Sequence, residues 1–287
     1  MSSKRSKTFS KNRQNREQGI ALISVLWALL LLSGLAGAAA FMARTDAILT
    51  HKLGEFAQAE STTDAALVNA IAMLSDEKTS RHPPIDGQPQ SWDFQGIPVT
   101  VTISNEAGRI DVNTADDDLI LAFLYSQGIL EDGATVMLSD LRKYEHVTSG
   151  PAPQGTLRTI DELKKISSWA VQTIDCWTDA LTVYTGLPGV NPTDATRQVA
   201  AAFKWASDHQ MGNGKWTGAS VMPSARSDQS LLGEVLRIVA STSPNPDITA
   251  RSEWIGRLTG DAHQPTLTMR WSRVLKAPNS PCRNNVK

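Results

Sequence analysis

The chain has little of what most enzyme sites are built from. Its 287 residues include five histidines and two cysteines, and the histidines are scattered without a metal-ligand motif. It also lacks a glycine-rich phosphate loop, a nucleophile elbow and a recognisable catalytic triad. These absences argue against an enzyme and leave binding or structural roles.

An excess of charge of one sign is also missing. The formal net charge is −1, although the leader holds six basic side chains against one acid, so the rest of the chain is more acidic than the whole. Residues 109–185 carry six basic and twelve acidic side chains. A mildly acidic body argues against nucleic acid as a partner, because phosphate would be repelled.

The cysteines are too few for a metal cluster. Cys176 and Cys282 lie far apart and match no metal-ligand spacing. If the chain is exported to an oxidising compartment, the two could form a disulfide, and a free pair is the alternative.

One long segment has no charge at all. Between Glu17 and Arg44 every residue is uncharged. About 24 of these residues, at ~1.5 Å of rise each, form a helix long enough for a hydrocarbon core of ~30 Å. We therefore predict one transmembrane helix over residues 20–43, and the rest of the chain has no second candidate.

Residues 1–19 form a basic leader before this helix. Its basic residues are Lys4, Arg5, Lys7, Lys11, Arg13 and Arg16. By the positive-inside rule the leader stays in the cytoplasm, which places the body in the periplasm and the helix in the bacterial inner membrane. A secretory signal cut near Ala39 is the alternative, although the apolar run is about twice the usual length of such a signal.

The helix is predicted to continue past the membrane as an amphipathic segment over residues 44–78. Its apolar positions recur at helical spacing. They are Leu49, Leu53, Phe56, Leu67, Ile71 and Leu74.

A basic leader ending in Gly19, followed by such a helix, resembles the type IV pilin and pseudopilin class. The resemblance implies that prepilin peptidase cleaves after Gly19 and that Ile20 becomes the mature, N-methylated terminus. Most members have glutamate at the fifth mature position, where this chain has Ser24. Because an unpaired charge in hydrocarbon is costly, a subunit without that glutamate suits a terminal position in a fibre.

The remainder of the chain predicts an α+β fold. Alternating apolar residues indicate strands at 97–103, 236–240 and 267–271, with a weaker candidate at 254–259, and residues 80–90 read as a loop. Residues 79–108 and 230–275 would form a small antiparallel sheet, interrupted by an all-helical insert over residues 109–210. Residues 276–287 form a polar tail.

Five helices are predicted in the insert from their apolar spacing. Their ranges are 116–125, 133–144, 159–168, 169–181 and 194–208. Residues 211–229 are predicted as a mobile loop. We expect Trp216, an apolar residue in this polar stretch, to contribute to a partner contact.

The insert carries a second resemblance, to the helical domain of the type II secretion K subunit, general secretion pathway protein K. It rests on the segments 108–115 and 157–163, with an echo at 190–195. In physical terms, Asn113 or Thr114 could cap a helix, and Thr159 with Glu162 fits a capping box.

Together the two resemblances imply a minor pseudopilin at the tip of a type II secretion pseudopilus. Its partners would be the other minor pseudopilins, the major pseudopilin and prepilin peptidase. The small residues Ser33, Gly34 and Gly37 would let neighbouring helices approach closely. The family includes members with calcium, which could bind near Asp116–Asp118, although no ligands are assigned and charges at a helix start are the simpler interpretation.

Three other functions stay open. Asn-Thr-Ala before a helix also occurs in helix-hairpin-helix modules that bind DNA, but residues 125–130 match poorly and the acidic charge opposes it. A minor pilin of a type IV pilus shares the same architecture. A periplasmic binding module, secreted or anchored, would fit a chain cut near Ala39.

Overall fold

The computed structural model of the protein describes residues 11–76, 82–147, 156–169, 171–209, 211, 231–245, 248–261 and 263–274. The chain divides into two compact units, Met1–Ala57 and Gln58–Lys287. In chain order the elements are α1 (Lys11–Ser75), β1 (Pro89–Phe94), β2 (Ile97–Asn105), η1 (Glu106–Gly108), β3 (Ile110–Asp111), α2 (Asp117–Ser126), α3 (Glu131–Val147), η2 (Ile160–Lys165), α4 (Val171–Trp177), β4 (Leu181–Thr182), α5 (Arg197–Asp208), β5 (Val235–Asn245), β6 (Ile248–Leu258) and β7 (Thr266–Val274).

The first unit consists of the N-terminal part of α1. Among the described residues, Leu22–Ser75 is the one helix long and apolar enough to cross a membrane, with a mean hydropathy of 2.2 over its most apolar window. Its side chains from Leu22 to Gly54 are exposed. The segments predicted at 20–43 and 44–78 both fall in α1 as far as Ser75.

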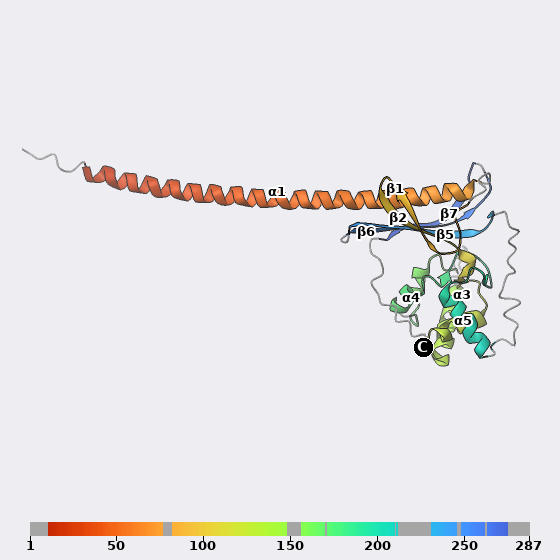
Figure 1. Ribbon diagram of the computed structural model, residues 1–287. Helices are drawn as coiled ribbons and strands as arrows, with labels where there is room; N and C mark the ends of the chain where they lie inside the picture. Colours follow the sequence, from red (N-terminus) through yellow and green to blue (C-terminus); the bar gives the residue numbers. More distant parts are fainter. Residues whose placement is uncertain are drawn as a thin grey trace, which may run out of the picture. The chain divides into compact units, whose positions relative to one another are not determined.

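A five-stranded antiparallel sheet organises the second unit, in the order β1-β2-β5-β6-β7 (Figure 1). Pairing of β2 with β5 places Ile103 opposite Ile238, and pairing of β5 with β6 places Ile238 opposite Trp254. Because β2 and β5 are neighbours in space but far apart in sequence, everything between them is an insert in the sheet.

One face of the sheet is apolar and packs against the C-terminal part of α1. Val99, Val101 and Ile103 alternate along β2 and are fully buried with Leu67 and Ala70 of α1. Burying a side chain such as Leu67 stabilises the fold by about 1.5–3 kcal/mol. The apolar residues at every second position of β2 thus pack against the apolar face of α1.

Polar contacts hold the edge of this sheet to α1. The hydroxyl groups of Thr63 and Ser252 are 2.9 Å apart and buried, and Ser252 donates a hydrogen bond of 2.8 Å to Asp64. Arg273 on the edge strand β7 donates to the same carboxylate at 3.0 Å. These bonds link β6 and β7 to one turn of the helix.

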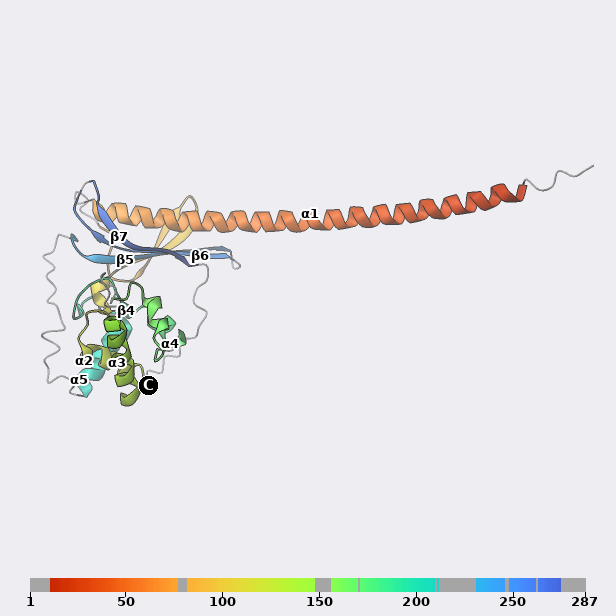
Figure 2. The same cartoon turned by 180° about the vertical axis from the view of Figure 1, so that it is seen from behind.

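The insert lies on the opposite face of the sheet from α1 (Figure 2). It has its own core, in which Phe123 of α2, Trp177 of α4 and Trp169 pack edge to face, with ring centroids 5.3 and 5.9 Å apart. Such pairs add about 0.5–1.5 kcal/mol each beyond burial alone. The predicted insert is therefore mainly helical, with the two-residue parallel pair β3 and β4 as an unpredicted addition.

Several local predictions differ from the structure. The helix expected at 159–168 is the 3₁₀-helix η2, and the one expected at 169–181 shortens to α4 before the chain extends into β4. Strand β1 was not predicted, and it overlaps the loop predicted at 80–90 only at Pro89 and Gln90. Its hairpin turn has positive φ at Gln95 (55°) and Gly96 (83°), the conformation of a type I′ turn, and Gln-Gly is not among its usual sequences.

The predicted helix caps are confirmed in part. Thr159 occupies the N-cap of η2 as predicted, although its side chain makes no cap bond, and the N-cap of α2 is Asp116 instead of Asn113 or Thr114. Asn113 instead exchanges two hydrogen bonds with the backbone of Leu157, at 2.9 and 2.8 Å, and Thr114 donates to the Leu187 carbonyl at 2.8 Å. These side chains bond to distant loops instead of capping a nearby helix. Each such bond links two loops, which a local cap would not do.

Candidate functional site

The predicted processing and packing residues all belong to α1. Gly19 and Ile20 fall within the helix, and Ser24 and Ser33 are exposed. A side chain added at Gly34 or Gly37 would meet nothing within 4 Å, so these positions are open to a neighbouring helix. Cleavage, methylation and helix packing at these residues stay predictions.

The same helix displays a continuous apolar surface. Its exposed large apolar side chains are Leu22, Ile23, Val25, Leu26, Trp27, Leu29, Leu30, Leu31, Leu32, Leu35, Phe41, Met42, Ile48, Leu49 and Leu53. A surface of this kind is not stable in water, because about 25 cal/mol is lost for each Å² left exposed. Contact with a membrane or with other helices would remove this surface from water.

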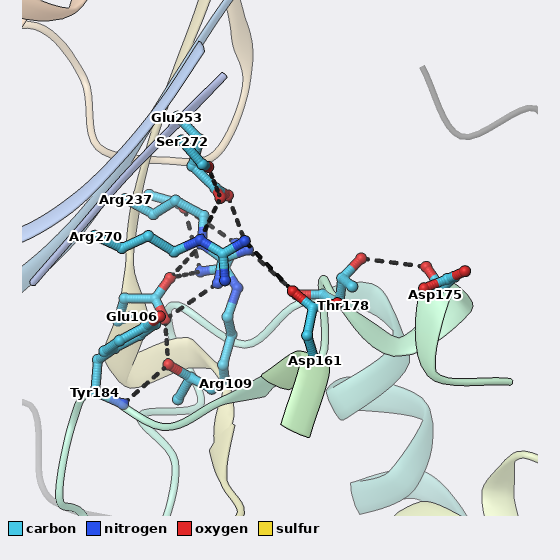
Figure 3. Close-up of polar contacts among 12 residues, drawn as sticks. Glu106, Arg109, Asp161, Asp175, Thr178, Tyr184, Arg237, Glu253, Arg270 and Ser272 are labelled. Carbon is cyan, nitrogen blue, oxygen red and sulfur yellow. Dashed lines mark hydrogen bonds and ion pairs between the residues drawn. The ribbon is translucent and has the colours of Figure 1, made fainter. Parts of the chain in front are cut away.

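A buried carboxylate joins the insert to the sheet (Figure 3). Glu106 directly follows β2 and has no exposed surface. Its Oε1 lies 2.6 Å from Nε of Arg237 on β5 and 3.2 Å from Nη1 of Arg109. Its Oε2 accepts a hydrogen bond from the hydroxyl of Thr182 on β4. One side chain thus connects the sheet, the start of the insert and its parallel strand pair.

The network continues across the polar face of the sheet. Nη1 of Arg237 lies 3.4 Å from Glu253 of β6 and donates to the carbonyl of Thr178 at 3.2 Å. Arg270 of β7 lies 3.8 Å from Glu253 and 3.6 Å from Asp161 of η2 (Figure 3). Charges of both signs alternate on this face. The insert is therefore held to the sheet by ion pairs, whereas α1 packs on the other face mainly through apolar contacts.

Burial and ion pairing oppose each other at Glu106. Burial raises the pKa of the Glu106 carboxyl, but the guanidinium groups of Arg237 and Arg109 and the Thr182 hydroxyl outweigh it, so the pKa lies below its usual value. For Arg237, burial lowers the pKa, and Glu106 and Glu253 more than restore it. Both groups are therefore ionised at neutral pH.

Asp111 is the opposite case. It is buried beside β4, and burial raises its pKa despite four hydrogen bonds to its oxygens. The donors are the backbone N–H groups of Asn113, Thr185 and Gly186, at 3.1, 2.9 and 2.8 Å, and the Thr185 hydroxyl at 3.0 Å. Asp111 therefore fixes the turn after β4 at some electrostatic cost.

Gly108 permits a close backbone contact between residues 107–108, at the start of the insert, and residues 191–196, just before α5. At Gly108 a Cβ would lie 1.8 Å from the carbonyl oxygen of Asp194, which is an impossible separation. The close approach lets Asn191 donate to the Ala107 carbonyl at 2.7 Å and Thr196 donate to the Gly108 carbonyl at 3.2 Å. Residues 190–195, which echo the sequence of residues 108–115, therefore lie against the start of that segment.

Arg142 has a role that the sequence did not reveal. Its Nη2 donates to the Ala115 carbonyl at 2.7 Å and its Nη1 to the Val112 carbonyl at 3.3 Å. It also pairs with Asp117 at 2.8 Å. One guanidinium thus holds the loop between β3 and α2, the loop on which the second resemblance rests.

The remaining predicted residues are placed as follows. Among the described residues no group of three or more His, Cys, Asp or Glu side chains could hold a metal ion, and Asp117 is committed to Arg142. Cys176 is not a free thiol, but Cys282 lies outside the described residues, so their pairing stays a prediction. Trp216 and the loop predicted at 211–229 also lie outside, apart from Met211.

The charged junction has a signal in the sequence that was not used in the predictions above. Arg237, Glu253 and Arg270 occupy strand positions on one face, where charged residues are uncommon in a covered sheet. Their occurrence on three adjacent strands indicates a buried or half-buried polar network. Glu106 and Arg109 gave no comparable signal, because a charged pair at a strand end is ordinary.

No protein-family model matches the chain, and no curated protein matches it. Among solved structures, it is similar to a chain in the crystal structure of the GspK-GspI-GspJ complex from the type 2 secretion system of enterotoxigenic Escherichia coli. The TM-score is 0.52 at 10% identity, and the match covers 78% of this chain and 99% of that chain.

The protein has a pseudopilin-type fold. The predicted α+β class, with its long N-terminal helix, small antiparallel sheet and inserted helical region, is confirmed. At 10% identity the likeness concerns the fold alone.

Proposed function

We propose that this protein is a minor pseudopilin of the K type, located at the tip of a type II secretion pseudopilus. It would initiate and cap the fibre and have no catalytic activity. The observation that carries the proposal is the order of parts along one chain: an exposed apolar helix, its sheet-packed continuation, and a large insert between β2 and β5. A chain of the GspK-GspI-GspJ complex has a similar fold.

The anchor would work through residues 20–43. In the inner membrane, with the N-terminus in the cytoplasm, its apolar side chains would face lipid and the helices of other minor pseudopilins. Ser33 is exposed, and a Cβ added at Gly34 or Gly37 would meet nothing within 4 Å, which leaves room for close helix packing. Ser24 offers no carboxylate to the terminal amine of a subunit below, which fits a subunit that starts a fibre.

The insert would supply the cap. It is held on the polar face of the sheet by buried ion pairs, so its bulk is attached firmly to the body. A firmly attached mass at the tip would block addition of a further subunit, and growth from below would push substrate outward. The major pseudopilin and prepilin peptidase are its further expected partners.

The decisive test is the mature N-terminus. Mass spectrometry of membrane fractions from cells with and without prepilin peptidase should find a methylated chain beginning at Ile20 when the peptidase is present. Without it, the uncut chain should remain. A mature start near Ala39, or a chain that is uncut in both strains, would refute the pseudopilin proposal.

A second measurement distinguishes a subunit of a type II secretion system from a subunit of a type IV pilus. Co-purification of the full chain in a mild detergent with the I-type and J-type minor pseudopilins of the same cell should yield a stable complex. Substituting leucine for Gly34 and Gly37 together should weaken that complex, because the larger side chains keep helices apart. Surface filaments that depend on this chain would instead indicate a type IV pilus.

A further inference from the structure

A polar groove lies between the insert and part of the sheet. Its volume is about 820 Å³, within the range typical of ligand sites. One wall is the polar face of β2, β5 and β6, and the other is formed by α4, the start of α5 and the residues before it. Arginines and aspartates both line the groove. Charge alone therefore does not identify an occupant.

Both ends of one chain segment lead to this groove. Strand β7 ends at Val274, which pairs with Arg251 of β6, and Arg251 lines the groove. Cys176 of α4 also lines the groove and is not a free thiol. Because the sequence has only one other cysteine, Cys282, a disulfide between the two would bring Cys282 to the groove as well. Residues 275–282 would then begin and end at its lining.

The sequence of this segment is unsuited to extending the sheet. Pro278 and Pro281 lack the N–H group that pairing with a neighbouring strand requires, so we do not expect the segment to continue β7 as a paired strand. Proline also favours an extended backbone without internal hydrogen bonds. The N–H and C=O groups of the other residues in the segment therefore need partners outside the sheet.

The groove contains polar atoms that lack partners. Among the buried side-chain atoms of the described residues, Nε of Arg109, Oγ1 of Thr196 and Oε1 of Gln198 have no hydrogen-bond partner, and all three residues line the groove. Arg109 is only 6% exposed. Gln198 lies beside the cysteine, because its Nε2 donates to the Cys176 carbonyl at 3.0 Å. An extended backbone, which offers donors and acceptors in turn, would satisfy such atoms.

Charge is compatible with the same segment. Residues 275–283 contain two basic side chains and no acid. Asp179 lines the groove three residues after Cys176, is exposed, and forms no direct hydrogen bond or ion pair with another described residue. Arg283, which follows Cys282, would lie within reach of this carboxylate.

We propose that residues 275–282 occupy the groove as a strap, held at one end by β7 and at the other by a disulfide between Cys282 and Cys176. The bond forms when the two thiols give up two protons and two electrons to a disulfide-containing oxidant, which is reduced to two thiols. The strap joins the last strand of the sheet to the insert, so the insert stays attached when its ion pairs open. This role does not depend on the proposed fibre function.

Limited proteolysis of the full chain in an uncharged detergent tests the strap. Trypsin cuts after Lys276 when the segment is accessible, and mass spectrometry measures the rate of this cut. It should be at least tenfold slower in the wild type than in Cys282→Ser, because proteases cut exposed segments in preference to bound ones. Adding a reductant to the wild type should speed the cut in the same way.

Three further variants distinguish the groove from the disulfide. Ser241→Trp and Arg251→Trp would each fill the groove from its sheet wall, and neither side chain forms a hydrogen bond or ion pair with another residue that the structure describes. Each should speed the cut after Lys276 at least tenfold while the disulfide stays intact. Ser139→Trp, exposed on α3 outside the groove, should leave the rate unchanged. Far-UV circular dichroism checks the fold of each variant, and two groove variants are used so that one misfolded protein does not decide the test.

Two results would overturn the proposal. If the wild type and Cys282→Ser are cut equally fast, the segment is not held at all. If Cys282→Ser speeds the cut but neither groove variant does, the segment is tied to Cys176 outside the groove. Both results leave the mature N-terminus unaffected, so the strap and the pseudopilin proposal fail separately.

Discussion

Glu106 combines full burial with a full charge, which is a costly state for any carboxylate. Its two guanidinium partners and one hydroxyl offset that cost only while all of them remain in place. The buried Arg237 would lose the nearer of its two carboxylate partners, Glu106 and Glu253, if Glu106 were lost. A buried pair is therefore more sensitive to the loss of one partner than its net contribution to stability suggests.

We predict that Glu106→Gln lowers the free energy of unfolding by about 3–5 kcal/mol. Urea titration of the full chain in detergent, followed by tryptophan fluorescence, measures the change. Asp161→Asn is the matched control, because its carboxylate also pairs with an arginine of the sheet but is 59% exposed. It should cost less than about 1 kcal/mol. Equal losses in the two variants would contradict the ionic junction.

The pKa of Glu106 predicts a pH dependence. Because the pKa is lowered on folding, the ionised carboxylate stabilises the protein above its usual value of 4.5, and this contribution is lost as the pH falls through the folded value. Asp111 has a raised pKa and works in the opposite direction, since its contribution falls as the pH rises through its folded value.

Stability measured against acidic pH should therefore fall less steeply in Glu106→Gln than in the wild type, by at most about 1.4 kcal/mol per pH unit. Asp111→Asn is the comparison variant, and it should make the acid side steeper. Identical slopes in the wild type and Glu106→Gln would show that Glu106 does not keep its charge.

At the scale of the element, α1 carries two different surfaces in neighbouring residues. Leu67 is fully buried against the sheet, whereas Val68 is 56% exposed. Leu67→Ala should destabilise the protein by about 2–5 kcal/mol, because it removes buried methyl groups and leaves a cavity. Val68→Ala should change stability by less than about 0.5 kcal/mol. Thermal unfolding of the two variants in parallel tests the predicted orientation of the helix.

Periodicity predicted the elements whose burial is one-sided. Alternation in β2 and the three-to-four spacing of Leu67 and Leu74 both reflect contact with one face, and both were found from the sequence. β1 was missed because its pattern is only half-buried and its Gln95-Gly96 turn uses a residue that rarely takes positive φ. Helix ends were also missed where bonds to distant loops, such as that of Asn113, replace local caps.

The charged junction could not be predicted in detail, for a different physical reason. Glu106 follows β2 and Arg237 lies on β5, two strands that are neighbours only in the folded sheet because the whole insert separates them in sequence. A single sequence contains no distance between them. By contrast, a helix long and apolar enough to cross a membrane was predictable, because that property depends on local composition alone.

At the scale of the whole molecule, one covalent bond would tie the C-terminal tail to the insert. We predict a disulfide between Cys176 and Cys282. Alkylation of the purified protein without reductant should modify neither cysteine, and alkylation after reduction should modify both. Cys176→Ser should lower the free energy of unfolding by about 2–5 kcal/mol. Modification of Cys282 without reductant would refute the pairing.

Asn105 at the end of β2 pairs with Leu236 at the start of β5, and its side chain also donates a hydrogen bond to Glu234 at 2.7 Å. The insert thus leaves the sheet and returns to it at neighbouring positions on two adjacent strands. Removing the insert and closing the gap with a short turn would uncover Arg237, Glu253 and Arg270, whose charges water solvates readily. Recombination at this one junction would therefore exchange the insert while α1 and the sheet stay the same.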